Sequence, residues 1–205
     1  MSNVKKGKCC RLCGSSNLDR ILKLASTPPA NAFVAESNSD FDQKKYPLEL
    51  FFCNNCCHVQ LLEVVNPIEL FKNYVYVSGT SPVFVEHFNK YAKSIVEKYK
   101  PKKDELVLDI GSNDGTLLKF FKKMGYTTLG VDPAKEISKK AHQDGIETIS
   151  DFFTFKLSEK IKNNYSKASL ITANNVFAHC DDLKGMTKAI SNLLSPEGIF
   201  VFEVS

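Results

Sequence analysis

Six of the seven cysteines lie in two short clusters, and their spacing suits the binding of a metal ion. Cys10 and Cys13 form one Cys-x-x-Cys pair, and Cys53 and Cys56 form a second pair farther along the chain. Four thiolates match the tetrahedral coordination of zinc, and closing a loop through the metal organises a segment with little apolar core of its own. Because four thiolates leave no open position for water or substrate, the predicted zinc is structural.

The choice of ligands has alternatives, because Cys9 and Cys57 are neighbours of the predicted pairs. Either residue could replace a ligand through a slip of one position, although Cys9 would then lengthen the first pair to Cys-x-x-x-Cys. The thiols could also be unconnected buried or redox-active groups, and four thiolates accept iron as well as zinc. We predict zinc bound by the two shorter pairs.

A tight polar turn follows an apolar segment in residues 106–117. Gly111 and Gly115 carry no side chain, so a ligand can approach the backbone there, and Asn113 tolerates the positive φ of such a bend. The Gly-x-x-x-Gly spacing differs from the Gly-x-Gly-x-x-Gly motif of dinucleotide-binding proteins, and the Lys-Ser/Thr ending of a P-loop is missing. The turn therefore argues against a diphosphate ligand.

Polar residues follow three later apolar segments. Asp132 follows the first of these segments, residues 127–131, and can accept both hydroxyls of a ribose, or it can cap the helix that Pro133 opens. Asp151 can hydrogen-bond an adenine amino group or cap a helix. Asn175 and His179 can face a reacting group, although His179 can also be a partly buried spacer.

A parallel sheet would bring these residues together. Beyond Asp104, apolar segments alternate with helical ones, which predicts an α/β fold with crossover helices. The predicted strands are 106–110, 127–131, 147–150, 169–173 and 199–204, and the predicted helices are 116–124, 134–143, 155–165 and 181–194. Because ligands bind at the carboxyl ends of such strands, we expect the polar residues to line one cleft.

The chain is predicted to have three parts. These are a small loop-rich zinc domain at 1–65, a bridging helical segment at 66–103 and the α/β domain at 104–205. Apolar residues recur every three to four positions from Val83 to Tyr99, which predicts an amphipathic helix in the bridge.

Composition and charge exclude some classes of function. The net charge of +4 comes from lysines scattered through segments with a helical pattern, and it is too small to indicate nucleic-acid binding. No segment approaches the roughly 20 apolar residues of a membrane span, and no apolar stretch follows the first charged residues. We predict a cytoplasmic protein that binds neither nucleic acid nor a membrane.

Several motifs together resemble one family, the zinc-containing sugar C-methyltransferases that act on nucleotide-linked deoxy-keto sugars. The resemblance covers nearly the whole chain. Its motifs here are Cys10-Arg-Leu-Cys-Gly, Pro28-Pro-Ala-Asn-Ala-Phe33, Tyr46-Pro-Leu-Glu-Leu, Cys53-Asn-Asn-Cys-Cys-His-Val-Gln-Leu61, Tyr74-Val-Tyr-Val-Ser-Gly-Thr-Ser81, Gly111-Ser-Asn-Asp-Gly115 and Asn175-Val-Phe-Ala-His179.

The resemblance implies a zinc domain, a Rossmann-like class I methyltransferase domain that binds S-adenosylmethionine, and a further domain that completes the sugar site. In this family a base removes a proton next to the sugar ketone, and the enolate then attacks the sulfonium methyl group. The base and the last strands of the sheet are expected beyond Ser205. We therefore expect an incomplete sheet here and little or no activity of this chain alone.

The resemblance also implies roles for individual residues. Those expected at the cofactor are Tyr76, Ser78, Gly111, Asp114, Gly115, Asp132 and Asn175. Tyr76 is expected near the methyl group or its sulfur, Asp132 at the ribose, and His179 on the sugar side as a candidate catalytic residue. The four zinc cysteines carry over unchanged, but Cys57 stands where the family has a small residue.

Two other functions remain open. One is a zinc-ribbon module that binds nucleic acid or a protein partner, with the α/β part as a scaffold. The aromatic and acidic segment from Tyr46 to Phe52 argues against a basic recognition surface on such a module. The other is a methyltransferase that uses S-adenosylmethionine on another small molecule or on RNA. The sequence leaves open the sugar, the carbon that is methylated and the oligomeric state.

Overall fold

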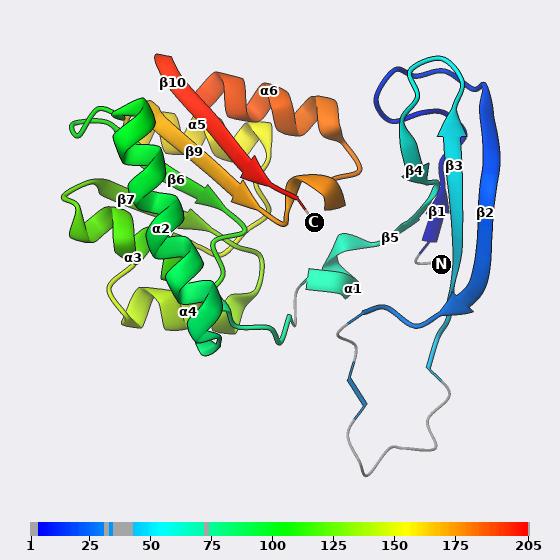
Figure 1. Ribbon diagram of the computed structural model, residues 1–205, viewed down its shortest axis with the longest axis horizontal. Coiled ribbons are helices and arrows are strands. Elements are labelled where there is room, and N and C mark those ends of the chain that lie inside the picture. Colours follow the sequence, from blue (N-terminus) through cyan, green and yellow to red (C-terminus); the bar gives the residue numbers. More distant parts are fainter. Residues whose placement is uncertain (1–3, 31–32, 35–42, 72–73, 205) are drawn as a thin grey trace. The chain divides into compact units, whose positions relative to one another are not determined.

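The computed structural model describes residues 4–30, 33–34, 43–71 and 74–204. The chain divides into two compact units between Val75 and Tyr76, drawn from blue to cyan and from green to red in Figure 1. Within the described residues, no helix combines the length and the apolar character that a membrane crossing requires.

The first unit is built from short antiparallel strands. One sheet has the order β2-β3-β4, with strands Leu18–Thr27, Tyr46–Cys53 and Val59–Leu61. A second, two-stranded sheet pairs β1 (Val4–Lys6) with β5 (Glu63–Val65), and the short helix α1 (Pro67–Phe71) follows. The sequence analysis expected loops here and missed the strands.

The second unit is a doubly wound parallel sheet with the strand order β10-β9-β6-β7-β8, which confirms the predicted α/β fold. Its strands are β6 (Leu106–Ile110), β7 (Thr127–Val131), β8 (Thr148–Ile149), β9 (Ala168–Asn174) and β10 (Leu194–Glu203). The strand order reverses at β6, between β7 and β9. A ligand cleft is therefore expected at the carboxyl ends of β6 and β9.

Helices cover both faces of this sheet (Figure 1). The helices after β6 are α3 (Thr116–Lys123), α4 (Lys135–Gln143), α5 (Phe155–Asn164) and α6 (Leu183–Leu193). Leu106, Leu108 and Ile110 of β6 pack with α5 and α6, whereas Val107 packs on the opposite face with α2 and α3. All five residues of β6 are buried, so the turn that follows this strand starts from a rigid support.

Helix α2 (Pro82–Tyr99) belongs to the core of the second unit. Its buried residues Phe88, Ala92 and Ile95 pack with Val107 and Phe121. The sequence analysis placed this helix in a separate bridge. An apolar stripe at helical spacing shows that a helix is amphipathic, but it does not show which partner covers the stripe.

Candidate functional site

The four predicted zinc cysteines lie together in the first unit. Their sulfur atoms all lie within 4.8 Å of one another. The Sγ atoms of Cys10 and Cys56 are 3.6 Å apart, and those of Cys13 and Cys53 are also 3.6 Å apart. Zn–S bonds of about 2.3 Å in a tetrahedron place sulfurs about 3.8 Å apart. The cluster therefore fits a zinc ion and keeps no position for a substrate.

The two cysteine pairs have matching backbones. The amide of Gly14 donates to the carbonyl of Cys10, and the amide of Cys57 donates to the carbonyl of Cys53, both at 2.8 Å. Gly14 has φ +80° and Cys57 has φ +61°. Cys57 thus occupies the left-handed position that glycine holds in the first pair, and both Cys9 and Cys57 are exposed, outside the sulfur cluster.

In the second unit, the turn after β6 has the expected bends. Gly111, Asn113 and Gly115 have φ of +69°, +51° and +74°. The amides of Gly111 and Ser112 both donate to the carbonyl of Val131, at 2.7 and 3.3 Å. The turn is therefore tied to the end of β7, where Asp132 follows.

Gly111 has two reasons to be glycine, its positive φ and the close approach of the Val176 side chain, and these give a first prediction. A Cβ at this position would lie 2.3 Å from Cγ2 of Val176. We expect Gly111→Ala to lower the free energy of unfolding by about 3 kcal/mol, because left-handed strain and overpacking add. Gly125→Ala is the control, with φ +85° but only the Lys103 amine nearby at 3.7 Å, and it should cost about 1 kcal/mol. Equal losses in urea unfolding would contradict the role of the Val176 contact.

Asp132 is buried beside the turn. Its Oδ2 accepts from the amide of Asn113 at 2.9 Å, and its Oδ1 accepts from the amide of Ala134 at 2.8 Å. Burial raises the pKa of this carboxyl group, and the two amide hydrogen bonds act in the opposite direction. Each carboxylate oxygen has a second lone pair, so Asp132 can still accept from a ligand. The bond to Ala134 lets Asp132 support the residue that precedes α4, in keeping with the helix-start interpretation, and the role of Asp132 at a ribose stays a prediction.

A segment far from the turn in sequence is held against it. We call residues 76–80, which include the short helix Ser78–Thr80, the strap. Asn113 Nδ2 donates to the carbonyl of Tyr76 at 2.9 Å, and Asn113 Oδ1 accepts from the amide of Ser78 at 3.0 Å. Asp114 Oδ2 accepts from the amide of Gly79 at 3.1 Å. The structure therefore brings Tyr76 and Ser78 to the glycine turn, and it identifies Asn113 as a linking residue that the sequence analysis treated only as a bend.

The carboxyl ends of β9 and β10 carry the remaining predicted residues. Asn175 has φ +55° and is exposed, and its amide donates to the carbonyl of Glu203 at 2.7 Å. His179 is exposed at the end of a short helix, Phe177–His179. Asp151 is exposed too and does not cap α5, because Thr154 has that role and accepts from the amide of Leu157.

Two buried polar side chains at this edge are unsatisfied. Among the described residues, Ser112 Oγ and both amide atoms of Asn174 have no hydrogen-bond partner. They follow β6 and end β9, at the predicted cleft. Unpaired buried side-chain atoms also occur elsewhere in this unit, at Tyr91, Glu105 and Ser195, so the unpaired atoms at this edge do not by themselves mark a ligand site.

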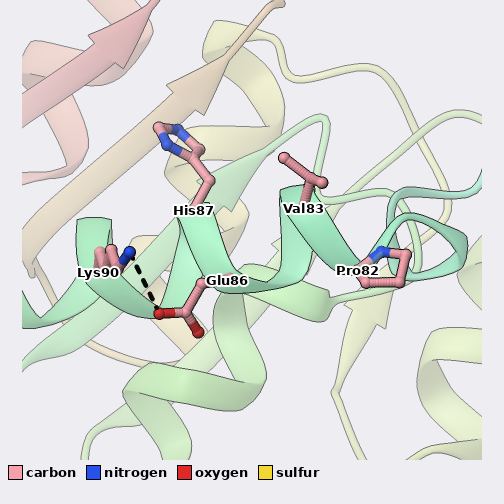
Figure 2. Close-up of a pocket in the computed structure, with 5 residues that line it drawn as sticks. All are labelled: Pro82, Val83, Glu86, His87 and Lys90. Carbon is pink, nitrogen blue, oxygen red and sulfur yellow. Dashed lines mark ion pairs between the residues drawn. The ribbon is translucent and has the colours of Figure 1, made fainter.

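A hydrogen-bonded pair of side chains that the sequence did not reveal joins α2 to the end of β10. His87 Nε2 lies 2.8 Å from Glu203 Oε2, and the imidazole stacks on Tyr91. His87 also lines a hollow of about 500 Å³ with Pro82, Val83, Glu86 and Lys90 (Figure 2). All five residues come from one helix, and none was predicted as a site residue.

Together, a doubly wound sheet, a glycine turn and an acid at the tip of the next strand define a nucleotide-binding α/β protein with a separate four-thiolate site. Residues 84–205 match the family described as "Methyltransferase domain", and residues 10–71 match the family described as "Putative zinc binding domain". The chain therefore belongs to the methyltransferase-domain family. This confirms the predicted Rossmann-like methyltransferase sheet behind a zinc-binding domain, and the family implies S-adenosylmethionine as the methyl donor.

Known proteins resemble the chain over different shares of its length. It is 31% identical over 95% of its length to C-methyltransferase NovU of Streptomyces niveus, and it covers 46% of that protein. It is 27% identical over 48% of its length to the mitochondrial ubiquinone biosynthesis O-methyltransferase of Bos taurus, of which it covers 28%. The chain thus spans less than half the length of both relatives.

The fold of the second unit also has a counterpart among solved structures. The PH0226 protein from Pyrococcus horikoshii OT3 is 16% identical, with a TM-score of 0.50. The similarity covers 63% of this chain and 58% of the other. At this identity, the likeness supports the fold alone.

Proposed function

We propose that the second unit binds S-adenosylmethionine and that the protein is a methyltransferase that transfers the methyl group to carbon. The proposal rests on one observation above all, the buried Asp132 carboxylate joined by hydrogen bond to the turn that ends the central strand. This arrangement places a ribose acceptor beside backbone that a ligand can approach. S-adenosylmethionine supplies an electrophilic methyl group on a sulfonium ion.

The residues of the cleft have distinct proposed roles. Asp132 accepts the ribose hydroxyls, and Gly111 and Gly115 give the ligand access to the backbone of the turn. Ser112 and Asn174, unsatisfied and buried, hydrogen-bond the polar parts of the cofactor. The strap brings Tyr76 and Ser78 to the methionine end, and exposed Asn175 and His179 lie at the carboxyl end of β9, on the acceptor side.

For the acceptor, we propose a nucleotide-linked deoxy-keto sugar. The support is the similarity over nearly the whole chain, zinc unit included, to a protein named as a C-methyltransferase. Carbon next to a ketone becomes nucleophilic when a base removes its proton, and the resulting enolate can take the methyl group. We place His179 on the sugar side of the site as a candidate catalytic residue, and we assign the proton acceptor to no residue of this chain.

An oxygen acceptor on another small molecule is the second candidate. The ubiquinone biosynthesis relative, which matches about half of the chain, is named as an O-methyltransferase. Incubation of the complete protein with labelled S-adenosylmethionine and either a keto sugar nucleotide or a catechol separates the two candidates by the product that carries the label.

Cofactor binding gives the direct test. Calorimetric titration of the zinc-loaded chain is expected to show binding of S-adenosylmethionine and none of NAD. Asp132→Ala should lower the affinity for S-adenosylmethionine by tenfold or more, because it removes one to two charge-assisted hydrogen bonds to the ligand. The control is Asp144→Ala, because Asp144 is an exposed acid that pairs with Lys119 at 2.9 Å. Unchanged affinity in a folded Asp132→Ala variant, or equal binding of NAD, would refute the proposal.

A further inference from the structure

The backbone of the strap is hydrogen-bonded to two side chains of the turn, those of Asn113 and Asp114. Asn113 reaches the carbonyl of Tyr76 and the amide of Ser78, and Asp114 reaches the amide of Gly79. Beyond the strap, Ser81 begins α2, where its hydroxyl accepts from the amide of Phe84 at 3.4 Å. The strap is thus a lead-in to α2 whose backbone polar groups are bonded by two adjacent side chains of the turn.

There is no spare room between the strap and Asp114. A Cβ on Gly79 would lie 2.4 Å from Oδ2 of Asp114 and 2.9 Å from Oγ1 of Thr116. Asp114 is itself buried, and its other oxygen accepts from both the amide and the hydroxyl of Thr116, at 3.2 and 2.7 Å. Both carboxylate oxygens accept hydrogen bonds from the protein, and through these bonds Asp114 positions the strap and the start of α3.

Asn113 bonds in two directions. Its amide donates to Oδ2 of Asp132, the proposed ribose acceptor, while its side chain holds the strap. Its φ of +51° turns the backbone so that both sets of bonds can form. A single residue thus links the two places where opposite ends of one ligand would lie.

We propose that Asn113 and Asp114 are positioning residues that hold the strap as the clamp for the methionine end of S-adenosylmethionine, while Asp132 holds the adenosine end independently of the strap. This inference rests on the proposed function and deepens it. Because the clamp acts through the strap, loss of the bonds that hold the strap should lower the affinity for ligands that extend past the ribose. The affinity for ligands that end at the ribose should not change.

Two variants disturb the contact between the strap and the turn, one by a substitution in the turn and one by a substitution in the strap. Asn113→Gly suits the left-handed backbone and removes both side-chain bonds to the strap, together with the bond from the amide of Asp114 to Asn113 Oδ1 at 3.0 Å. Gly79→Ala places a Cβ against the Asp114 carboxylate and Thr116 Oγ1 and substitutes no residue of the turn. Lys100→Gly is the matched control, because Lys100 also has a left-handed φ, +47°, and an exposed side chain in the same unit. Each variant is titrated with S-adenosylmethionine, S-adenosylhomocysteine and adenosine.

Both variants are expected to lower the affinity for S-adenosylmethionine and S-adenosylhomocysteine by about tenfold. The affinity for adenosine should change by less than about twofold. Lys100→Gly should leave the affinities for all three ligands unchanged, and Asp132→Ala should lower all three affinities. In amide hydrogen exchange, S-adenosylmethionine should protect residues 76–80 in the wild type and not in Asn113→Gly.

Distinct results would overturn the clamp and the function. If the wild type binds S-adenosylmethionine through Asp132 while both strap variants bind it equally well, the clamp alone is refuted. Equal losses for adenosine and S-adenosylmethionine would mean a collapsed turn and would also refute the clamp. A folded wild type without affinity for S-adenosylmethionine would overturn both proposals.

Discussion

Removal of zinc is expected to unfold the first unit and to leave the parallel sheet of the second unit folded. Among the described residues of the first unit, the buried apolar side chains are Tyr46, Leu62 and two of the zinc cysteines. The second unit has two buried clusters, one on each face of its sheet. A structural zinc contributes on the order of 10 kcal/mol to folding, which a unit with so small a core cannot replace.

A chelator titration followed by amide hydrogen exchange tests this expectation. Exchange protection should disappear from β2 and β3 as zinc is removed, while β6 and β9 stay protected. Loss of protection in both units at the same chelator concentration would contradict the independence of the second unit. Unchanged protection of β3 would show that zinc does not hold the first unit together.

Single cysteine variants test which thiols bind the metal. Cys56→Ser should lose the zinc, whereas Cys57→Ser should keep it, because Cys57 is exposed and lies outside the sulfur cluster. Cys57→Gly should keep the zinc as well and be at least as stable, since it relieves a left-handed φ of +61°. Loss of zinc from Cys57→Ser would support the shifted ligand set instead.

The zinc unit shows what residue spacing can and cannot predict. Two Cys-x-x-Cys pairs were enough to predict the four clustered thiols, because ligand geometry is local to each pair. Strand β2 was missed, since its residues are almost all exposed and show no alternation of buried and exposed positions. Its partner β3 follows after a long connection, so sequence alone gives no register for the pairing.

In the second unit, the strands and the turn were predictable because they are consecutive in sequence. Apolar runs bounded by glycines and polar residues mark the buried parallel strands. The strap was not predictable from spacing, since Ser78 and Asn113 are 35 positions apart and their contact runs through backbone groups that every residue has. Only the family resemblance pointed to Tyr76 and Ser78.

The second large effect concerns Asp109, an acid in the middle of the buried strand β6. It is almost fully buried, and Thr172 Oγ1 donates to its Oδ1 at 2.7 Å. Burial raises the pKa of this carboxyl group from 3.8 to about 7, the hydrogen bond from Thr172 acts in the opposite direction, and the nearby Asp132 charge raises it further. The sequence shows an acid within an otherwise apolar strand here, but it does not show whether the acid has a hydrogen-bond partner.

The raised pKa makes stability depend on pH with a defined sign. Between about pH 4 and pH 7 the folded chain keeps a proton on Asp109 that the unfolded chain has released. This contribution to stability is therefore complete below pH 4 and is lost as the pH rises through about 7. Integrated over that range at about 1.4 kcal/mol per pKa unit, the loss is up to about 4 kcal/mol.

Asp109→Asn should remove this pH dependence, because the amide keeps an oxygen for Thr172 and carries no charge. In urea unfolding of the zinc-loaded chain, the variant should exceed the wild type by up to about 4 kcal/mol at pH 8, and the difference should shrink toward zero near pH 4. Asp104→Asn, at an exposed acid of the same unit, should show no such trend. A difference that stays constant between pH 5 and pH 8 would mean that Asp109 is charged in the folded protein throughout, so that burial in β6 does not control its proton.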